Sequence, residues 1–185
     1  MPEETRPTYV LVDGENIDAT LGSMLGRRPR PEERPRWERL LEFVRERWGQ
    51  PANGLFYLAA NGELPMAFVQ ALLAMGYRPI ALSGNSAVKV VDVAIQRTLV
   101  ELRRRDADVL LVSNDGDFVE QVQGLLEGRR VGIAGFVEFR NLAFSALRDQ
   151  GLETFDLEYD MRAFTERLPR VRIIPIDEFD PTQFL

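Results

Sequence analysis

The chain has 185 residues, of which 45 % are hydrophobic and 28 % are charged, so its length is close to that of one ordinary domain and its composition excludes a wholly disordered or collagen-like chain. Cysteine and histidine are both absent, which excludes a thiol nucleophile, a disulfide, a zinc finger and a Ser-His-Asp triad. The remaining chemistry is that of carboxylates, hydroxyls and amines. Any metal ligands must therefore be oxygen atoms, which favours Mg²⁺ or Mn²⁺ over softer ions.

The formal net charge of −6 gives the molecule no overall basic character for binding nucleic acid, so local charge must decide. The basic residues are almost all arginines, and Lys89 is the only lysine. The N-terminal segment MPEETRP is polar and unlike a signal peptide, and the apolar runs are too short to span a bilayer. We therefore predict a cytoplasmic protein without a membrane partner.

The first half of the chain alternates between predicted strands and helices. Repeated prolines predict a loop at 26–36, since proline breaks both regular structures, and the proline within 77–82 indicates an edge strand. In chain order we expect a strand at 8–13, a helix at 15–25, the loop at 26–36, a helix at 36–48, a strand at 54–59, a helix at 64–75 and a strand at 77–82.

The alternation continues in the second half of the chain. We expect a helix at 89–104, a strand at 108–113, a helix at 116–127, a strand at 129–135, a helix at 139–149 and a short strand at 152–157. The tail after Pro169 is expected to add an edge strand or to pack on a partner. These boundaries divide the chain into an N-terminal tail at 1–7, one domain at 8–168 and a C-terminal extension at 169–185.

The expected strands are apolar enough for burial on both faces, which is typical of a parallel sheet covered by helices. We predict a doubly wound α/β fold, a three-layer α/β/α sandwich with a mainly parallel sheet in the order 3-2-1-4-5. In such sheets, ligands bind beyond the carboxyl ends of the strands. Functional residues are therefore expected in the segments that directly follow strands.

Four aspartates occupy such positions or lie close to them. Asp13 ends the first strand in VLVDGEN, Asp115 and Asp117 follow the fourth strand in LLVSNDGDF, and Asp92 lies in the first turn of the preceding helix. If the first and fourth strands are neighbours, these carboxylates converge, and their mutual repulsion raises some of their pKa values unless a divalent cation is bound. Such an ion lowers the pKa of water and neutralises a phosphodiester, so hydrolysis of a phosphodiester fits this chemistry best.

Each aspartate also has a purely structural interpretation. Asp13 with Gly14 forms an ordinary turn, Asp115 or Asp117 caps the following helix, and Asp92 interacts with its helix dipole. The sequence DGDFV at 115–119 also fits the nucleophile motif of haloacid dehalogenase-type phosphatases, although Lys89 precedes it rather than follows it. A Toprim-like metal site would use Glu15 with Asp115 and Asp117, but it leaves Asp92 without a role.

Three ordered motifs, VDGEN at 12–16, KVVDV at 89–93 and SNDGDF at 113–118, closely resemble the NYN domain of PIN-like nucleases, particularly its LabA-like branch. The resemblance covers about residues 8 to 157. It implies a PIN-like α/β/α sandwich, a Mg²⁺ or Mn²⁺ site and cleavage of RNA, with single-stranded or loop RNA as the expected partner. The positions that match the family's acidic residues, and are thus the expected catalytic and metal-binding residues, are Asp13, Asp92, Asp115 and Asp117.

Other residues of these motifs are candidates by the same resemblance. Asn16 matches the asparagine after the first strand, and Ser113 opens the third motif, followed by Asn114, so all three are expected to bind substrate. Lys89 matches the lysine of the family's KGVD pattern, and we expect its amine to pair with the scissile phosphate and act in catalysis.

Two positions depart from the family's pattern. Val90 stands where a glycine is usual, and Thr98 stands where many members carry a further aspartate. A threonine cannot replace the charge of a carboxylate. Both departures predict weaker metal binding and favour the main alternative function, which is a PIN-like RNA-binding or regulatory module with a silent metal site.

Two clusters of arginines are candidates for phosphate contacts, because such contacts do not depend on sequence. We expect Arg30 and Arg34 of the proline-rich loop to bind substrate, although a charge run is often only a solvated surface. Aromatic side chains such as Phe118 are expected in the core. The sequence leaves a homodimer open. The clusters are Arg27, Arg28, Arg30, Arg34 and Arg36 in and beside the loop, and Arg103, Arg104 and Arg105.

Overall fold

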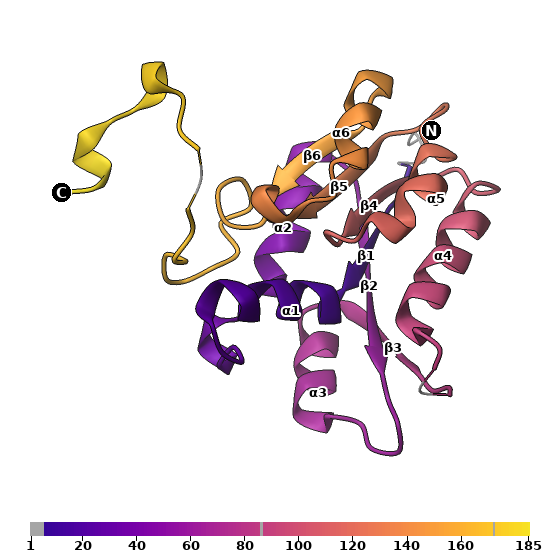
Figure 1. The fold of residues 1–185 in the computed structure, drawn as a ribbon. Coiled ribbons are helices and arrows are strands. Elements are labelled where there is room, and N and C mark those ends of the chain that lie inside the picture. The colour runs from indigo at the N-terminus through magenta and orange to yellow at the C-terminus, as the bar shows by residue number, and fades with distance from the viewer. Residues whose placement is uncertain (1–5, 86, 172) are drawn as a thin grey trace.

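The computed structural model describes residues 6–85, 87–171 and 173–185. Its six strands form one sheet in the order β3-β2-β1-β4-β5-β6, and every neighbouring pair is parallel (Figure 1). The predicted order 3-2-1-4-5 is thus confirmed, with β3 at one edge as its proline indicates and β6 added at the other edge. The strands are β1 (Thr8–Asp13), β2 (Ala52–Ala59), β3 (Tyr77–Leu82), β4 (Asp108–Val112), β5 (Val131–Gly135) and β6 (Glu153–Asp156).

Helices cover both faces of the sheet, which confirms the predicted three layers (Figure 1). Alternate residues of β1 explain the two cores: Val10 and Val12 belong to one apolar cluster and Leu11 to the other. The first cluster contains residues of α1 to α3 and the second contains residues of α4 to α6. The helices are α1 (Gly14–Leu25), α2 (Trp37–Trp48), α3 (Met66–Ala74), α4 (Val90–Leu102), α5 (Val119–Gln123) and α6 (Ala143–Leu147).

The last two helices are shorter than predicted. In the segment 116–127, the Asp115 side chain accepts a hydrogen bond from the backbone N–H of Asp117 at 2.9 Å, and Gly116–Phe118 form a 3-10 turn before α5 begins. In the segment 139–149, the Asn141 side chain accepts a hydrogen bond from the N–H of Ala143, so α6 starts only after it. Local side-chain bonds to the backbone therefore replace helical turns at both places.

Two proline-containing segments also differ from expectation. The loop at 26–36 contains one 3-10 turn, Pro31–Glu33, whose first position suits proline because no N–H is needed there. The described residues of the tail after Pro169 form no strand, so the predicted edge strand is wrong. They form two 3-10 turns instead, Ile176–Glu178 and Pro181–Gln183, and Figure 1 shows this tail leading away from the sheet.

One residue of the tail is nevertheless fixed to the body. The side chain of Arg170 is 1 % exposed, and its guanidinium binds both carboxylate oxygens of Asp156 at 2.6 and 2.7 Å. It also lies 2.7 Å from a carboxylate oxygen of Glu138 and 4.2 Å from the ring centre of Tyr159. Arg170 therefore joins the start of the tail to the ends of β5 and β6. The domain boundaries at 8–168 and 169–185 stay a prediction.

Candidate metal centre

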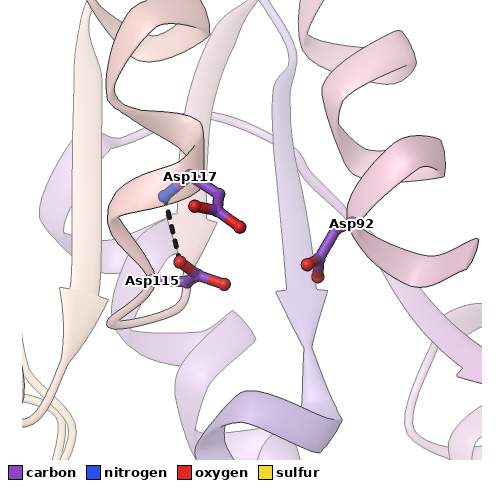
Figure 2. A group of neighbouring side chains, drawn as sticks. All are labelled: Asp92, Asp115 and Asp117. Carbon is purple, nitrogen blue, oxygen red and sulfur yellow. Dashed lines mark hydrogen bonds between the residues drawn. The ribbon is translucent and has the colours of Figure 1, made fainter. Parts of the chain in front are cut away.

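Three aspartates lie together at the carboxyl edge of the sheet. Asp115 and Asp117 come from the loop after β4, and Asp92 faces them from the first turn of α4 (Figure 2). Each offers a carboxylate oxygen within 4.8 Å of those of the other two. This spacing is close to twice the Mg–O distance of about 2.1 Å, so the donor set fits one hard divalent cation.

The fourth predicted aspartate, Asp13, lies beside this group but is not a member of it. Asp13 ends β1 next to β4, and it is only 2 % exposed. One of its carboxylate oxygens accepts a hydrogen bond from Ser113 Oγ at 2.9 Å, and the other accepts one from the N–H of Asn16 at 3.4 Å. Direct metal ligation by Asp13 therefore stays a prediction.

A cleft of about 430 Å³ opens at this edge of the sheet. It brings Asp13, Asp92 and Asp115 together with the predicted residues Lys89 and Asn16. It also contains Glu15, which the sequence implicates only in the Toprim-like alternative. The other lining residues are Ala59, Asn61, Gly84, Asn85, Val88, Val90 and Val91.

Hydrogen bonds hold the loop that carries the two acids after β4. Ser113 Oγ accepts from the N–H of Asp115 at 3.1 Å while it donates to Asp13. Gln96 of α4 donates to the backbone carbonyl of Asp117 at 3.0 Å. The loop is therefore tied to β1 by Ser113 and to α4 by Gln96, which fixes the distance across the acidic group.

Ser113 and Asn114 are buried, at 0 % and 6 % exposed. The Asn114 carboxamide accepts from the N–H of Phe136 at 2.9 Å and donates to Thr20 at 3.3 Å, and its backbone N–H donates to the Asn16 side chain at 2.8 Å. The polar atoms of Asn114 are therefore bonded inside the protein, and these bonds support the loops after β1, β4 and β5. Contact with substrate by these residues stays a prediction that none of their observed contacts supports.

Lys89 supplies a positive charge beside the acids. Its Nζ atom lies 3.7 Å from Asp92 Oδ2 and 3.8 Å from Asp117 Oδ2, and its side chain is 76 % exposed. Contacts of this length and exposure stabilise the fold little. The amine is thus free to turn towards a ligand in the cleft.

Four carboxyl groups line the cleft, those of Asp13, Glu15, Asp92 and Asp115, whereas Lys89 is the one cation among its described lining residues. The pKa of Asp13 is raised to about 6, mainly by burial and also by the charges of Asp92 and Asp115, against the lowering effect of the hydrogen bonds from Ser113 and Asn16. The pKa of Asp92 is also raised, by burial first and then by Asp115, while Lys89 opposes the shift. Excess charge on oxygen ligands is what a bound divalent cation would relieve.

The raised pKa of Asp13 predicts a pH-dependent stability that Asp13→Asn removes. Because the folded state holds this proton more tightly than the unfolded state, the carboxyl group disfavours folding increasingly as the pH rises from about 4 through about 6. In EDTA, the melting temperature of Asp13→Asn should therefore rise relative to that of the wild type as the pH increases over this range. Thermal melts at several pH values check this, and parallel curves would contradict it.

The two departures from the family pattern have clear structural settings. Val90 begins α4, and a Cβ atom on Gly84 would lie 2.5 Å from its side chain, so Val90 packs against the loop before α4. Thr98 Oγ1 accepts from the Tyr57 hydroxyl at 2.8 Å and donates to the carbonyl of Ala94. Thr98 thus belongs to the packing between α4 and β2, and it adds no charge to the acidic group.

The arginines of the proline-rich loop differ in whether they form ion pairs. Arg34 binds Asp18 of α1 at 2.6 Å, and Arg27 pairs with Glu33. Arg28 and Arg30 are exposed, and neither makes an ion pair with a residue that the structure describes. A second cleft of about 520 Å³ contains Arg27, Arg28 and Glu15, and so shares Glu15 with the first. Arg28 and Arg30 are therefore better placed than Arg34 to contact phosphates.

The second arginine cluster lies at the far end of α4 from the acids. The helix is about 20 Å long for 13 residues, with Asp92 in its first turn and Leu102 at its end. Arg105 there binds Glu101 at 3.2 Å. The prediction that Phe118 lies in the core is confirmed, since its side chain is 0 % exposed.

Comparison with known proteins identifies the domain. A family model described as NYN domain matches residues 7–158. The chain belongs to the NYN domain family. The matched residues of this NYN domain include the six strands of the sheet and the four candidate aspartates, Asp13, Asp92, Asp115 and Asp117. A crystal structure of a protein of unknown function from Vibrio parahaemolyticus is 17 % identical in sequence, with a TM-score of 0.65, and covers 86 % of this chain and 98 % of its own.

That similarity shows the shared fold alone. No curated protein matches the chain. Among the described residues, no helix is long and apolar enough to cross a membrane. The identification of the NYN domain therefore rests on the family model, and the chemistry must be argued from the site itself.

Proposed function

We propose that this NYN domain is a metal-dependent ribonuclease that hydrolyses phosphodiester bonds of single-stranded or loop RNA. The observation that carries the proposal is the group of three carboxylates at the carboxyl edge of a parallel sheet, within a PIN-like nuclease fold. When bound, Mg²⁺ or Mn²⁺ supplies charge neutralisation at the phosphate and an acidified water. RNA as the substrate, the LabA-like branch and a cytoplasmic location are parts of the same proposal.

The three acids and the cleft residues beside them would have different roles. Asp92, Asp115 and Asp117 would hold the ion, and Asp13 would add negative charge beside them while its bond to Ser113 anchors the loop after β4 to β1. Lys89, which is exposed beside these acids, would pair with a phosphate oxygen. Because histidine is absent, the chain supplies no imidazole base.

Incubation of the purified protein with a mixture of structured and single-stranded RNAs tests this proposal. We expect cleavage with Mn²⁺ or Mg²⁺ and none with EDTA. RNA that is bound but left intact with every ion would overturn the nuclease proposal.

Divalent metal should also stabilise the fold. An ion that binds only the folded state adds about 1.4 kcal/mol at ten times its Kd, which raises the melting temperature of a domain of this size by roughly 3–6 °C. Asp92→Asn removes the negative charge of one ligand and should abolish most of this rise. Asp149→Asn, an exposed carboxylate change elsewhere, serves as the control. Equal shifts in wild type and Asp92→Asn would mean that the ion binds elsewhere.

The exposed arginines should determine how RNA affinity depends on salt. Each phosphate neutralised on a single strand contributes about −0.7 to the slope of log K against log salt concentration. The double variant Arg28→Ala with Arg30→Ala should therefore make the slope less steep by about 1.4, with little change between RNA sequences. Arg47→Ala, an exposed change on α2, is the control. An unchanged slope would show that these arginines do not contact phosphates.

The second candidate function is an RNA-binding module without catalysis. Thr98 favours it, because this position adds no carboxylate and bonds to Tyr57 instead. The two candidates differ in the role of the acids: in a binding module, Asp117→Asn would leave RNA affinity unchanged and no cleavage would be seen in the wild type.

A further inference from the structure

The cleft beside the acids has a second end of different chemistry. One end contains Asp13, Glu15, Asp92 and Asp115, and Lys89 lies there as well, 3.7 Å from Asp92. The other end is formed by Ala59 at the end of β2 and by residues of the loops after β2 and β3. This uncharged end consists of Ala59, Asn61, Gly84, Asn85 and Val88.

The polar groups of the uncharged end are available to a ligand. The side-chain amide of Asn61, an exposed residue, has no hydrogen-bond partner among the described residues. Asn85 Oδ1 accepts from the N–H of Ala87 at 3.1 Å, which leaves its amide hydrogens to donate. Val88 is 49 % exposed and adds an aliphatic surface. The surface thus combines hydrogen-bonding amides with apolar contact and has no charged side chain.

We infer that the uncharged end of the cleft receives a nucleobase of the substrate strand, and that Asn61 is a specificity-determining residue for it. The inference rests on the proposed function, because the phosphate next to this base would lie at the acids. A phosphate would find no cationic side chain among the residues of this end. A nucleobase is neutral, and its edge offers a neighbouring donor and acceptor that a carboxamide can pair with.

The size of the cleft agrees with this assignment. Its volume of about 430 Å³ lies in the range of pockets that bind small molecules, so a base and its sugar find room beside the acidic end. None of the described residues that line the cleft is aromatic. Selectivity would therefore come from the amides and not from ring stacking, which accepts every base.

Binding of short labelled RNA homopolymers of A, C, G and U tests the inference. Fluorescence anisotropy is measured with Ca²⁺, and the same RNAs are analysed by gel to record cleavage separately. We expect the wild type to prefer at least one homopolymer about tenfold over the weakest, and Asn61→Ala to reduce this ratio to about threefold or less. Asn53→Ala, an exposed change at the amino end of β2, is the matched control and should keep the full ratio.

The outcomes separate the two proposals. Equal affinity of the wild type for all four homopolymers, or an undiminished ratio in Asn61→Ala, would overturn the base site. Asn61→Asp, which keeps the shape but removes the donor, should also lower the ratio, and unchanged melting temperatures would show that both variants fold. Selective binding that depends on Asn61, with no cleavage under Mn²⁺ or Mg²⁺, would support the base site and refute the nuclease.

Discussion

Replacing Asp115 by asparagine is expected to reduce RNA cleavage at least about 100-fold. Asp115 belongs to the group of three carboxylates, and it also accepts the hydrogen bond from the N–H of Asp117 at 2.9 Å. Asparagine keeps an oxygen in the same place, so the turn before α5 is preserved while the negative charge is lost. The effect should therefore appear in the cleavage rate at saturating RNA, measured under Mn²⁺.

Two comparisons make this result specific. Asp149→Asn makes the same chemical change at an exposed position outside the group and should leave the rate within about twofold. The affinity for RNA in EDTA should be similar in both variants, because the acidic group holds no divalent ion when EDTA is present. If Asp115→Asn cleaves as fast as Asp149→Asn, the acidic group is not the catalytic centre.

Arg170→Ala is expected to destabilise the fold by about 3 kcal/mol. The guanidinium is buried between Asp156, Glu138 and Glu158, and its removal leaves these carboxylates without a counter-charge. Burial alone would lower the pKa of Arg170, but the hydrogen bonds with Asp156 and Glu138 outweigh it and raise the pKa above its usual value. Urea unfolding near neutral pH measures the loss.

The pH dependence of this loss identifies its cause. Burial would raise the pKa of Asp156, yet the bonds from Arg170 and from backbone N–H groups lower it overall. A lowered carboxylate pKa contributes stability above the unfolded pKa and loses it as the pH falls through the folded pKa. The difference between wild type and Arg170→Ala should therefore shrink as the pH falls below about 4. Arg167→Ala, an exposed control, should cost little, and a loss equal to that of Arg170→Ala would contradict this account.

The sequence predicts the sheet better than it predicts the helices of the second half. β1 and β4 are buried on both faces, and short continuous apolar runs between turn residues are typical of strands in a parallel sheet. The segment 139–149 has the apolar spacing of a helix, but Asn141 bonds to the N–H of Ala143 and shortens the helix. Whether a polar side chain bonds to its own backbone depends on the tertiary surroundings, so periodicity does not reveal it.

The candidate site was predictable in position but not in its internal bonds. The rule that functional residues follow strands found Asp13, Asp115 and Asp117 but not Asp92, which lies on α4. Applied to the loops after β2 and β3, the same rule points to Asn61 and Asn85 of the cleft. It could not show that Arg34 binds Asp18, because the two are 16 residues apart and the intervening loop determines their approach. Nor could it show that Asn114 is turned inward, since its partner Phe136 follows a different strand.

The bond between Ser113 and Asp13 joins residues that are 100 positions apart in the chain. A contact of this separation closes a long loop, whose entropy cost must be met before the contact contributes any stability. The loop that carries Asp115 and Asp117 is therefore not anchored to β1 until β1 and β4 have paired, which requires the chain to be synthesised beyond Ser113. A divalent ion that needs this anchored loop should therefore slow unfolding rather than accelerate folding.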